Sequence, residues 1–135
     1  MTAVLDASAL LRFLDDEPGA ERVQQLLSRA RAGEAALLVS AVNWGEVIYA
    51  IARKRGADAA RDLAAKLFTL PLAIIPCSIT EAMEAGLFKE RFHLPYADAF
   101  AGSLALRRAA TLVTADFDFK SLPSGTLKID FLPRK

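Results

Sequence analysis

The sequence has very little of what several common protein chemistries require. Its 135 residues include one cysteine, Cys77, and one histidine, His93. A single cysteine excludes an intramolecular disulfide and a multi-cysteine zinc site. A single histidine argues strongly against a histidine-rich metal site or a His-Asp-Ser triad. Any metal site in this chain would therefore depend on oxygen ligands.

Long apolar runs and an excess of charge are also missing. No apolar run approaches the roughly 20 residues that cross a bilayer, and the start MTAVLDASALL lacks the basic segment of a signal peptide. We therefore expect one cytoplasmic domain over residues 1–135, without membrane contact. The formal net charge is +1, so any surface that attracts nucleic acid must be local. Hydrophobic residues make up 53% of the chain, which suits a tight core or a buried oligomer surface.

Short apolar segments alternate with helical patterns along the whole chain. We expect helices at residues 7–15, 20–32, 41–55, 57–70, 78–92 and 95–110, and a turn-rich loop at 116–125. The expected strands are residues 3–6, 36–40, 72–76, 111–114 and 127–132. This alternation predicts an α/β fold in which helices cover both faces of a parallel sheet.

Four acidic residues lie beside apolar segments that should be buried. They are Asp6 in VLDAS, Glu46 in NWGEVIYA, Asp98 in PYADAFAG and Asp116 in LVTADFDF. A carboxylate removed from water is costly unless something compensates its charge. No lysine or arginine lies within a few residues of the first three acids. A shared divalent cation is the simplest compensation, because Mg²⁺ and Mn²⁺ prefer oxygen ligands.

The positions of the acids only partly predict such a cluster. Asp6, Glu46 and Asp116 follow the carboxyl ends of strands, which meet at the edge where parallel sheets bind ligands. Asp98 does not follow from this rule, because its helix leads into a strand. Each acid also has an ordinary alternative role. Asp6 could cap a helix, with Ser8 as the other candidate cap, Asp98 could complement a helix dipole, and Asp116 could form a turn.

Glu46 requires a separate argument. It could be an ordinary exposed helix residue, but its helix is apolar nearly all round in its first half. That pattern predicts that Glu46 is buried.

The four motifs together resemble those of PIN-domain nucleases, and within them the VapC-type toxins of prokaryotic toxin–antitoxin pairs. The motifs are V-L-D-A-S at 4–8, N-W-G-E-V at 43–47, Y-A-D-A-F-A at 96–101 and V-T-A-D-F-D-F at 113–119. The resemblance covers the whole chain. It implies a three-layer α/β/α fold with a central, mainly parallel five-stranded sheet, and cleavage of RNA that depends on Mg²⁺ or Mn²⁺.

The resemblance also implies a role for individual residues. An acidic cluster that binds one or two Mg²⁺ or Mn²⁺ ions would consist of Asp6, Glu46, Asp98 and Asp116. Ser8 and Thr114 would orient a carboxylate or a water molecule, and Asp118 would be a less regular member of the site. The family further implies a homodimer and a small antitoxin protein whose segment fills the active-site groove.

Contacts to an RNA substrate are expected mainly from cations, which bind phosphates. The candidates are Arg12, on the first helix, and Arg53, which lies two turns from Glu46 on the same helix face. Trp44 and Tyr49 could stack a base, and packing in the core is the alternative for both.

Other classes of protein fit the sequence less well. A receiver-like phospho-acceptor domain needs an acid pair after the first strand and an acceptor aspartate after a middle strand. Here Asp6 stands alone, and the third expected strand ends in Pro76-Cys77. A catalytically silent PIN-like module that binds RNA or protein stays open, as does a metal-dependent DNA nuclease, because the acids alone do not decide between them.

Overall fold

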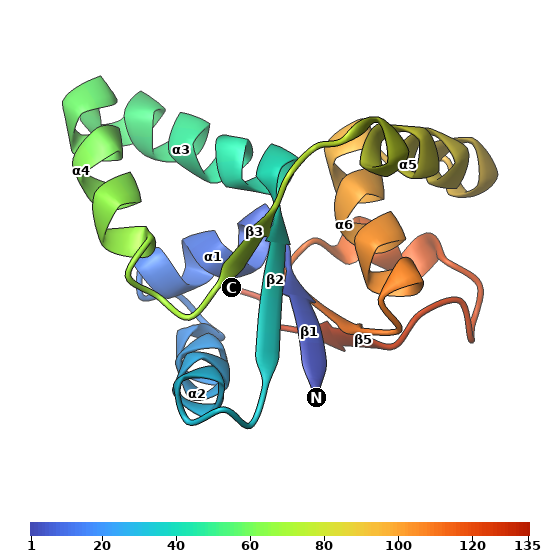
Figure 1. Ribbon diagram of the computed structural model, residues 1–135, viewed down its shortest axis with the longest axis horizontal. Helices are drawn as coiled ribbons and strands as arrows, with labels where there is room; N and C mark the ends of the chain where they lie inside the picture. The colour runs from blue at the N-terminus through green and yellow to red at the C-terminus, as the bar shows by residue number, and fades with distance from the viewer.

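The computed structural model describes residues 1–135 and contains one five-stranded sheet (Figure 1). The strands are β1 (Thr2–Leu5), β2 (Ala36–Ser40), β3 (Ala73–Ile75), β4 (Thr111–Thr114) and β5 (Ile129–Phe131). Their order is β3-β2-β1-β4-β5, and every neighbouring pair is parallel. The predicted α/β class and five-stranded sheet are therefore confirmed, and the sheet is parallel throughout rather than mainly parallel.

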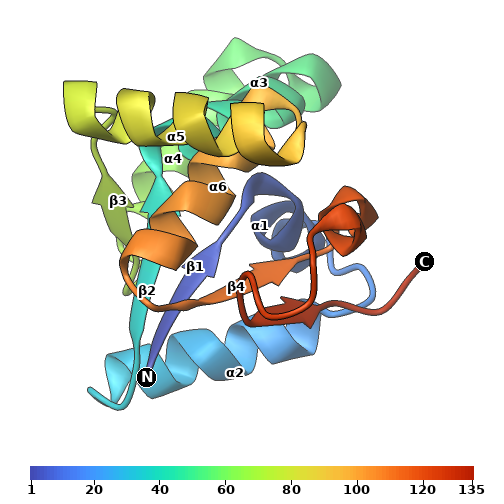
Figure 2. The same ribbon diagram turned by 90° about the vertical axis from the view of Figure 1, so that its right-hand side faces the viewer.

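The chain has six α-helices. They are α1 (Ala7–Leu14), α2 (Ala20–Arg31), α3 (Ala41–Arg55), α4 (Ala57–Leu67), α5 (Ile79–Phe92) and α6 (Tyr96–Arg107). Of these, α4 packs on α3 and α5 packs on α6. In Figure 1, α1 and α2 lie on one side of the strands and α6 on the other, which gives the three expected layers. Figure 2 shows α5 and α6 side by side, in agreement with their many contacts. No helix is both long and apolar enough to cross a membrane.

The strand β1 shows how its alternating residues build two separate cores. Ala3 and Leu5 belong to the cluster that packs against α1 and α2, whereas Val4 belongs to the cluster under α5 and α6. Successive side chains of a strand point to opposite faces of the sheet. All three residues are fully buried. This explains why Ala3, Val4 and Leu5 form a continuous apolar run instead of alternating with polar residues.

Several element boundaries differ from the expected ones. The strand β1 ends at Leu5, so Asp6 lies outside it and caps α1 by accepting the Ala9 N–H. Ser8, the other candidate cap, lies inside the helix. Residues Phe117–Ser121 of the expected loop form a short 3₁₀ helix, η1, which Asp116 caps. Two aspartates of the predicted cluster thus begin helices at the same edge of the sheet.

Candidate active site

The four predicted acids line one cavity at the carboxyl edge of the sheet. Its volume is about 310 Å³. The lining residues are Asp6, Ala7, Ser8, Leu11, Glu46, Tyr49, Ala50, Asp98 and Asp116. No lysine or arginine is among them, so the chain supplies negative charge here without a cation of its own.

Asp6 is buried and held by three hydrogen bonds. Its Oδ1 accepts the Ser8 hydroxyl at 2.6 Å and the Ala9 N–H at 3.0 Å. Its Oδ2 accepts the Thr114 hydroxyl at 2.5 Å. The carboxylate therefore has a fixed orientation, and only 3% of the residue is exposed.

The two hydroxyls that bind Asp6 are themselves held by the backbone beyond β4. Ser8 Oγ accepts the N–H of Ala115 at 2.8 Å, and Thr114 Oγ1 accepts the N–H of Asp116 at 2.9 Å. Each hydroxyl thus accepts one hydrogen bond from this segment and donates one to Asp6. The pair couples the carboxylate after β1 to the segment that carries Asp116.

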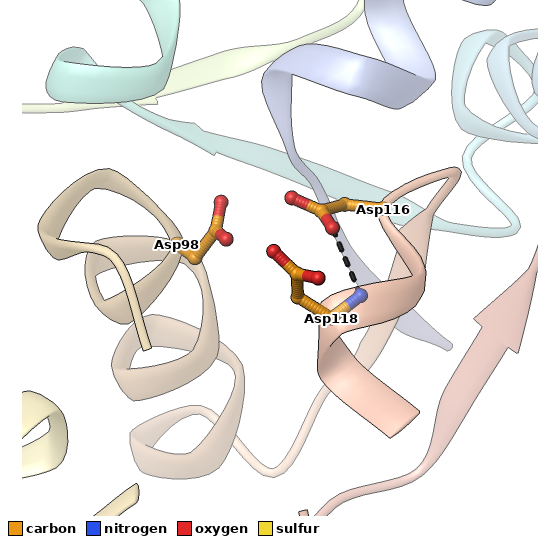
Figure 3. Close-up of side chains that lie close together, drawn as sticks. All are labelled: Asp98, Asp116 and Asp118. Carbon is orange, nitrogen blue, oxygen red and sulfur yellow. Dashed lines mark hydrogen bonds between the residues drawn. The ribbon is translucent and has the colours of Figure 1, made fainter. Parts of the chain in front are cut away.

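Three aspartates come close enough to share a single cation. One carboxylate oxygen each from Asp98, Asp116 and Asp118 lies within 4.8 Å of the other two. Figure 3 shows the Asp98 side chain extending from α6 toward the two aspartates at the start of η1. Asp116 Oδ1 also accepts the Asp118 N–H at 3.0 Å. Because all three ligands are carboxylate oxygens, they fit a hard divalent cation. Asp118 is exposed, while the other two are half-buried.

Burial and the neighbouring acids change the protonation of Asp98 and Asp6. Burial is the main cause that raises the pKa of Asp98 to about 8, and the charge of Asp116 is the next, with further contributions from Asp6 and Glu46. Burial also raises the pKa of Asp6 to about 6, although its hydrogen bonds from Ser8, Thr114 and Ala9 act in the opposite direction. Without a cation, the folded chain therefore retains protons in this cavity at a pH where ordinary aspartates are ionised.

Glu46 is exposed, so the prediction of its burial is wrong. The helical pattern of α3 showed apolar neighbours on several sides, but Glu46 faces the open cavity rather than the core. Its Oε1 accepts a hydrogen bond from Asn43 Nδ2 at 2.8 Å.

Asn43 was not singled out from the sequence. It is 1% exposed, and its amide also donates to the carbonyl of Ala97, the residue before Asp98, at 3.1 Å. Its Oδ1 accepts the hydroxyl of Ser40, the N-cap of α3. Asn43 thus connects the helix that carries Glu46 to the start of α6. The three-residue spacing from Ser40 is the sequence signal that could have identified it.

The two arginines expected to contact substrate differ in their surroundings. Arg12 is 7% exposed and donates to the carbonyls of Pro18 and Pro133, at 2.6 and 2.7 Å. These contacts connect α1 to the carboxyl-terminal segment, which is a structural role that its sequence position did not indicate. Arg53 is exposed and forms no ion pair. Between the two, Arg53 is the one that is free to bind a phosphate.

Known proteins share this fold over its full length. The VapBC2 structure from Rickettsia felis, bound to a DNA fragment from its promoter, has a TM-score of 0.77 at 18% identity, covering 98% of this chain and 100% of that chain. The DNA-bound VapBC of Salmonella typhimurium has a TM-score of 0.72 at 15% identity, with coverages of 97% and 98%. VapC20 of Mycobacterium tuberculosis, described as a sarcin-ricin loop cleaving toxin, has a TM-score of 0.63 at 16% identity, with coverages of 88% and 93%.

The sequence comparisons place the chain in a family. No match was found among curated proteins. Residues 3–124 match the PIN domain, and this range contains all four acids of the cavity and Asp118. The structural neighbours share the same fold, as the resemblance of the motifs implied. The chain therefore belongs to the PIN domain family.

Proposed function

We propose that the protein is a metal-dependent endoribonuclease that hydrolyses RNA phosphodiester bonds and acts as the toxin of a toxin–antitoxin pair. One observation carries the catalytic part of the proposal: four carboxylates line a cavity that contains no cationic side chain. Burial raises the pKa of Asp98 to about 8, and the neighbouring charge of Asp116, which no cation of the chain compensates, adds to this shift. A site of this kind suits a divalent cation, and only with that cation in place does it suit a polyanionic substrate.

The residues would divide the work between metal binding and positioning. Asp98, Asp116 and Asp118 would hold one Mg²⁺ or Mn²⁺ ion, and Asp6 and Glu46 would complete the site for one or two ions. When bound, such ions supply Lewis-acid chemistry, which activates water and stabilises the leaving oxygen of a phosphodiester. Hydrolysis forms a bond between phosphorus and the oxygen of water and breaks one P–O ester bond.

The remaining contacts of the chain keep these acids in place. Ser8 and Thr114 prevent the Asp6 carboxylate from rotating, because each of its oxygens accepts at least one of their hydrogen bonds. Asn43 keeps Glu46 at the open side of the cavity, where it can reach water and substrate. Preorganisation of this kind lowers the cost of reaching the transition state, since the charges need not reorient during the reaction.

The proposed partners are a cognate antitoxin and a second copy of the chain. Two proteins of similar fold support the antitoxin: one is a toxin–antitoxin complex from Klebsiella pneumoniae, and the other is VapBC-5 from Mycobacterium tuberculosis, a member of the VapBC family of toxin–antitoxin systems. The RNA substrate is supported by the description of VapC20 as a toxin that cleaves the sarcin-ricin loop. The high hydrophobic content of the chain is compatible with a buried interface in a homodimer.

The test is cleavage of a labelled RNA panel in Mn²⁺, in Mg²⁺ and in EDTA. Asp6→Asn and Asp98→Asn proteins are compared with Asp62→Asn, which changes an exposed acid on α4. We expect cleavage only with metal, abolished by the first two substitutions and retained by the third. Equal cleavage by every protein would mean a contaminating nuclease. Mn²⁺ binding without any cleavage would favour the alternative of a catalytically silent binding module.

A further inference from the structure

The face of α3 that reaches the acid cavity continues with an aromatic and a cationic residue. Glu46 and Tyr49 both line the cavity, three positions apart. Arg53 follows after four more positions, so the three side chains share one face of the helix. An acid, an aromatic ring and a cation therefore follow one another along α3, over about 10 Å of helix axis.

Tyr49 is exposed, and exposed tyrosines of this kind are enriched at interfaces. It is 65% exposed and belongs to neither core cluster. Trp44, the other aromatic residue of α3, is different: it packs against the core, and its ring lies 5.2 Å from that of Phe68. Core packing thus accounts for Trp44 and leaves Tyr49 unexplained by the fold.

The cavity adjoins a second pocket of about 380 Å³ whose lining carries charges of both signs. The charged residues of this second pocket are Arg12, Lys54, Lys135, Asp15 and Glu17, and Lys135 pairs with Glu17 at 2.6 Å. Lys54 already pairs with Asp15 at 3.0 Å, and Arg55 with the same carboxylate at 3.5 Å. Arg53 is the one cation of this turn that has no acidic partner. The last turn of α3 thus carries three cations against the single carboxylate of Asp15, so the charge changes from negative at the cavity to positive at the end of this helix.

We infer that Tyr49 stacks on an RNA base next to the scissile phosphate, and that Arg53 binds the following phosphate. This inference rests on the proposed ribonuclease function and adds the path of the strand along α3. Along α3, the acid cavity would take one phosphate, the ring of Tyr49 a base and Arg53 a second phosphate. This order matches a single strand, in which each pair of successive phosphates flanks a sugar that carries a base. Stacking on an aromatic ring tolerates any base, so Tyr49 contributes affinity and position more than sequence preference.

Substitutions at Tyr49 and at Arg53 should weaken RNA binding in different ways. Replacing Tyr49 removes stacking, which weakens binding by about tenfold or more and leaves its salt dependence unchanged. Replacing Arg53 removes one phosphate contact, which reduces the slope of log affinity against log salt by about 0.7. An ordinary structural role would produce neither pattern, because Tyr49 and Arg53 are both exposed.

The experiment uses an RNA oligonucleotide taken from a sequence that the native protein cleaves, with 2-aminopurine beside the scissile bond. Binding is measured in the Asp98→Asn background, which prevents cleavage, alone and combined with Tyr49→Leu, Tyr49→Phe, Arg53→Gln or Arg61→Gln. Arg61 is an exposed arginine of α4 and is the matched control. KM and kcat are measured for the same substitutions with Asp98 restored.

We expect the 2-aminopurine signal to be quenched by stacking, and Tyr49→Leu to abolish the quenching and raise Kd and KM about tenfold. Tyr49→Phe should retain the quenching and the native Kd and KM. Arg53→Gln should lower the slope of log affinity against log salt, and Arg61→Gln should change none of these quantities. Native Kd and quenching in Tyr49→Leu would overturn this inference alone, provided the native protein cleaves RNA. A native protein that neither binds nor cleaves RNA would overturn the proposed function as well.

Discussion

Thr114 donates a 2.5 Å hydrogen bond to Asp6, which connects the end of β4 to the first residue after β1. The same oxygen of Thr114 accepts the N–H of Asp116. Thr114 is completely buried, so neither hydrogen bond can be replaced by water without rearrangement. One hydroxyl therefore connects the carboxylate of Asp6 to the backbone that carries Asp116.

Replacement of the Thr114 hydroxyl by a methyl group tests the connection between Asp6 and the backbone of Asp116. Thr114→Val keeps the shape of the side chain and removes both hydrogen bonds. We expect a 10- to 100-fold loss of RNA cleavage, the range typical of groups that orient metal ligands, and a loss of about 1–3 kcal/mol in unfolding free energy. Thr114→Ser should recover most of both. Wild-type cleavage by a folded Thr114→Val protein would show that the Thr114 hydroxyl is not needed to orient Asp6.

The metal-free protein should lose stability as the pH rises. The folded-state pKa values of Asp6 and Asp98, about 6 and about 8, lie above the ordinary value of 3.8. The folded state therefore binds more protons than the unfolded state over this range, and the slope of unfolding free energy with pH is negative. The contribution is fully present below pH 3.8 and is lost as the pH rises through 6 for Asp6 and through 8 for Asp98.

Urea unfolding in EDTA between pH 5 and 9 measures this dependence. Asp98→Asn should flatten the upper part of the curve and raise stability near pH 8, because it removes a charge from the cluster. A metal-free protein whose stability does not change or rises over this range would contradict the raised pKa values of Asp6 and Asp98. An Asp98→Asn protein with the same dependence of stability on pH as the native protein would contradict the raised pKa of Asp98.

Metal binding near neutral pH should release a proton. A cation needs the ionised form of Asp98, whose pKa is raised to about 8, mainly by burial. Titration calorimetry with Mn²⁺ at pH 7, in two buffers of different ionisation enthalpy, should detect about one proton released per ion bound. Asp98→Asn should remove this difference between the buffers. An identical binding enthalpy in both buffers for the native protein would argue against metal binding at Asp98.

The turn before α2 should tolerate no side chain. Gly19 has φ +96°, and a Cβ there would lie 2.8 Å from the Cβ of Leu132. Gly33 has φ +80° with nothing within 4 Å of the added atom. Gly33→Ala should lower the free energy of unfolding by about 1–2 kcal/mol, because of the backbone conformation alone. Gly19→Ala should lower it by roughly 1–3 kcal/mol more, because the added methyl group overpacks against Leu132. Equal losses, measured by urea unfolding, would show that Leu132 yields without cost.

Much of the fold could be predicted from local patterns. Short apolar strands such as residues 36–40 alternate with helices, and a parallel sheet is the arrangement that buries both faces of such strands. Asp6 and Asp116 could be placed at one edge, because they are the first residue after β1 and the second residue after β4. The expected ends of β1 and β5 were one or two residues out, since the length of a strand depends on its neighbours.

The rest of the site depends on contacts between distant parts of the chain. The position of Asp98 depends on how α6 packs, and no pattern within residues 95–110 contains that information. Arg12 is held by a carbonyl at Pro133, 121 positions away. The exposure of Glu46 was predicted incorrectly because a helical pattern cannot distinguish a neighbour in the core from one beside an open cavity.

The most direct test of the central claim is the rate of RNA cleavage as a function of Mn²⁺ concentration. Native protein, Asp98→Asn and the control Asp62→Asn are measured side by side. We expect the native and control rates to rise from zero in EDTA to the same plateau, with a midpoint that equals the Mn²⁺ dissociation constant, and Asp98→Asn to stay at zero. Cleavage by native protein in EDTA, or an unchanged rate in Asp98→Asn, would contradict a metal-dependent nuclease site at these acids.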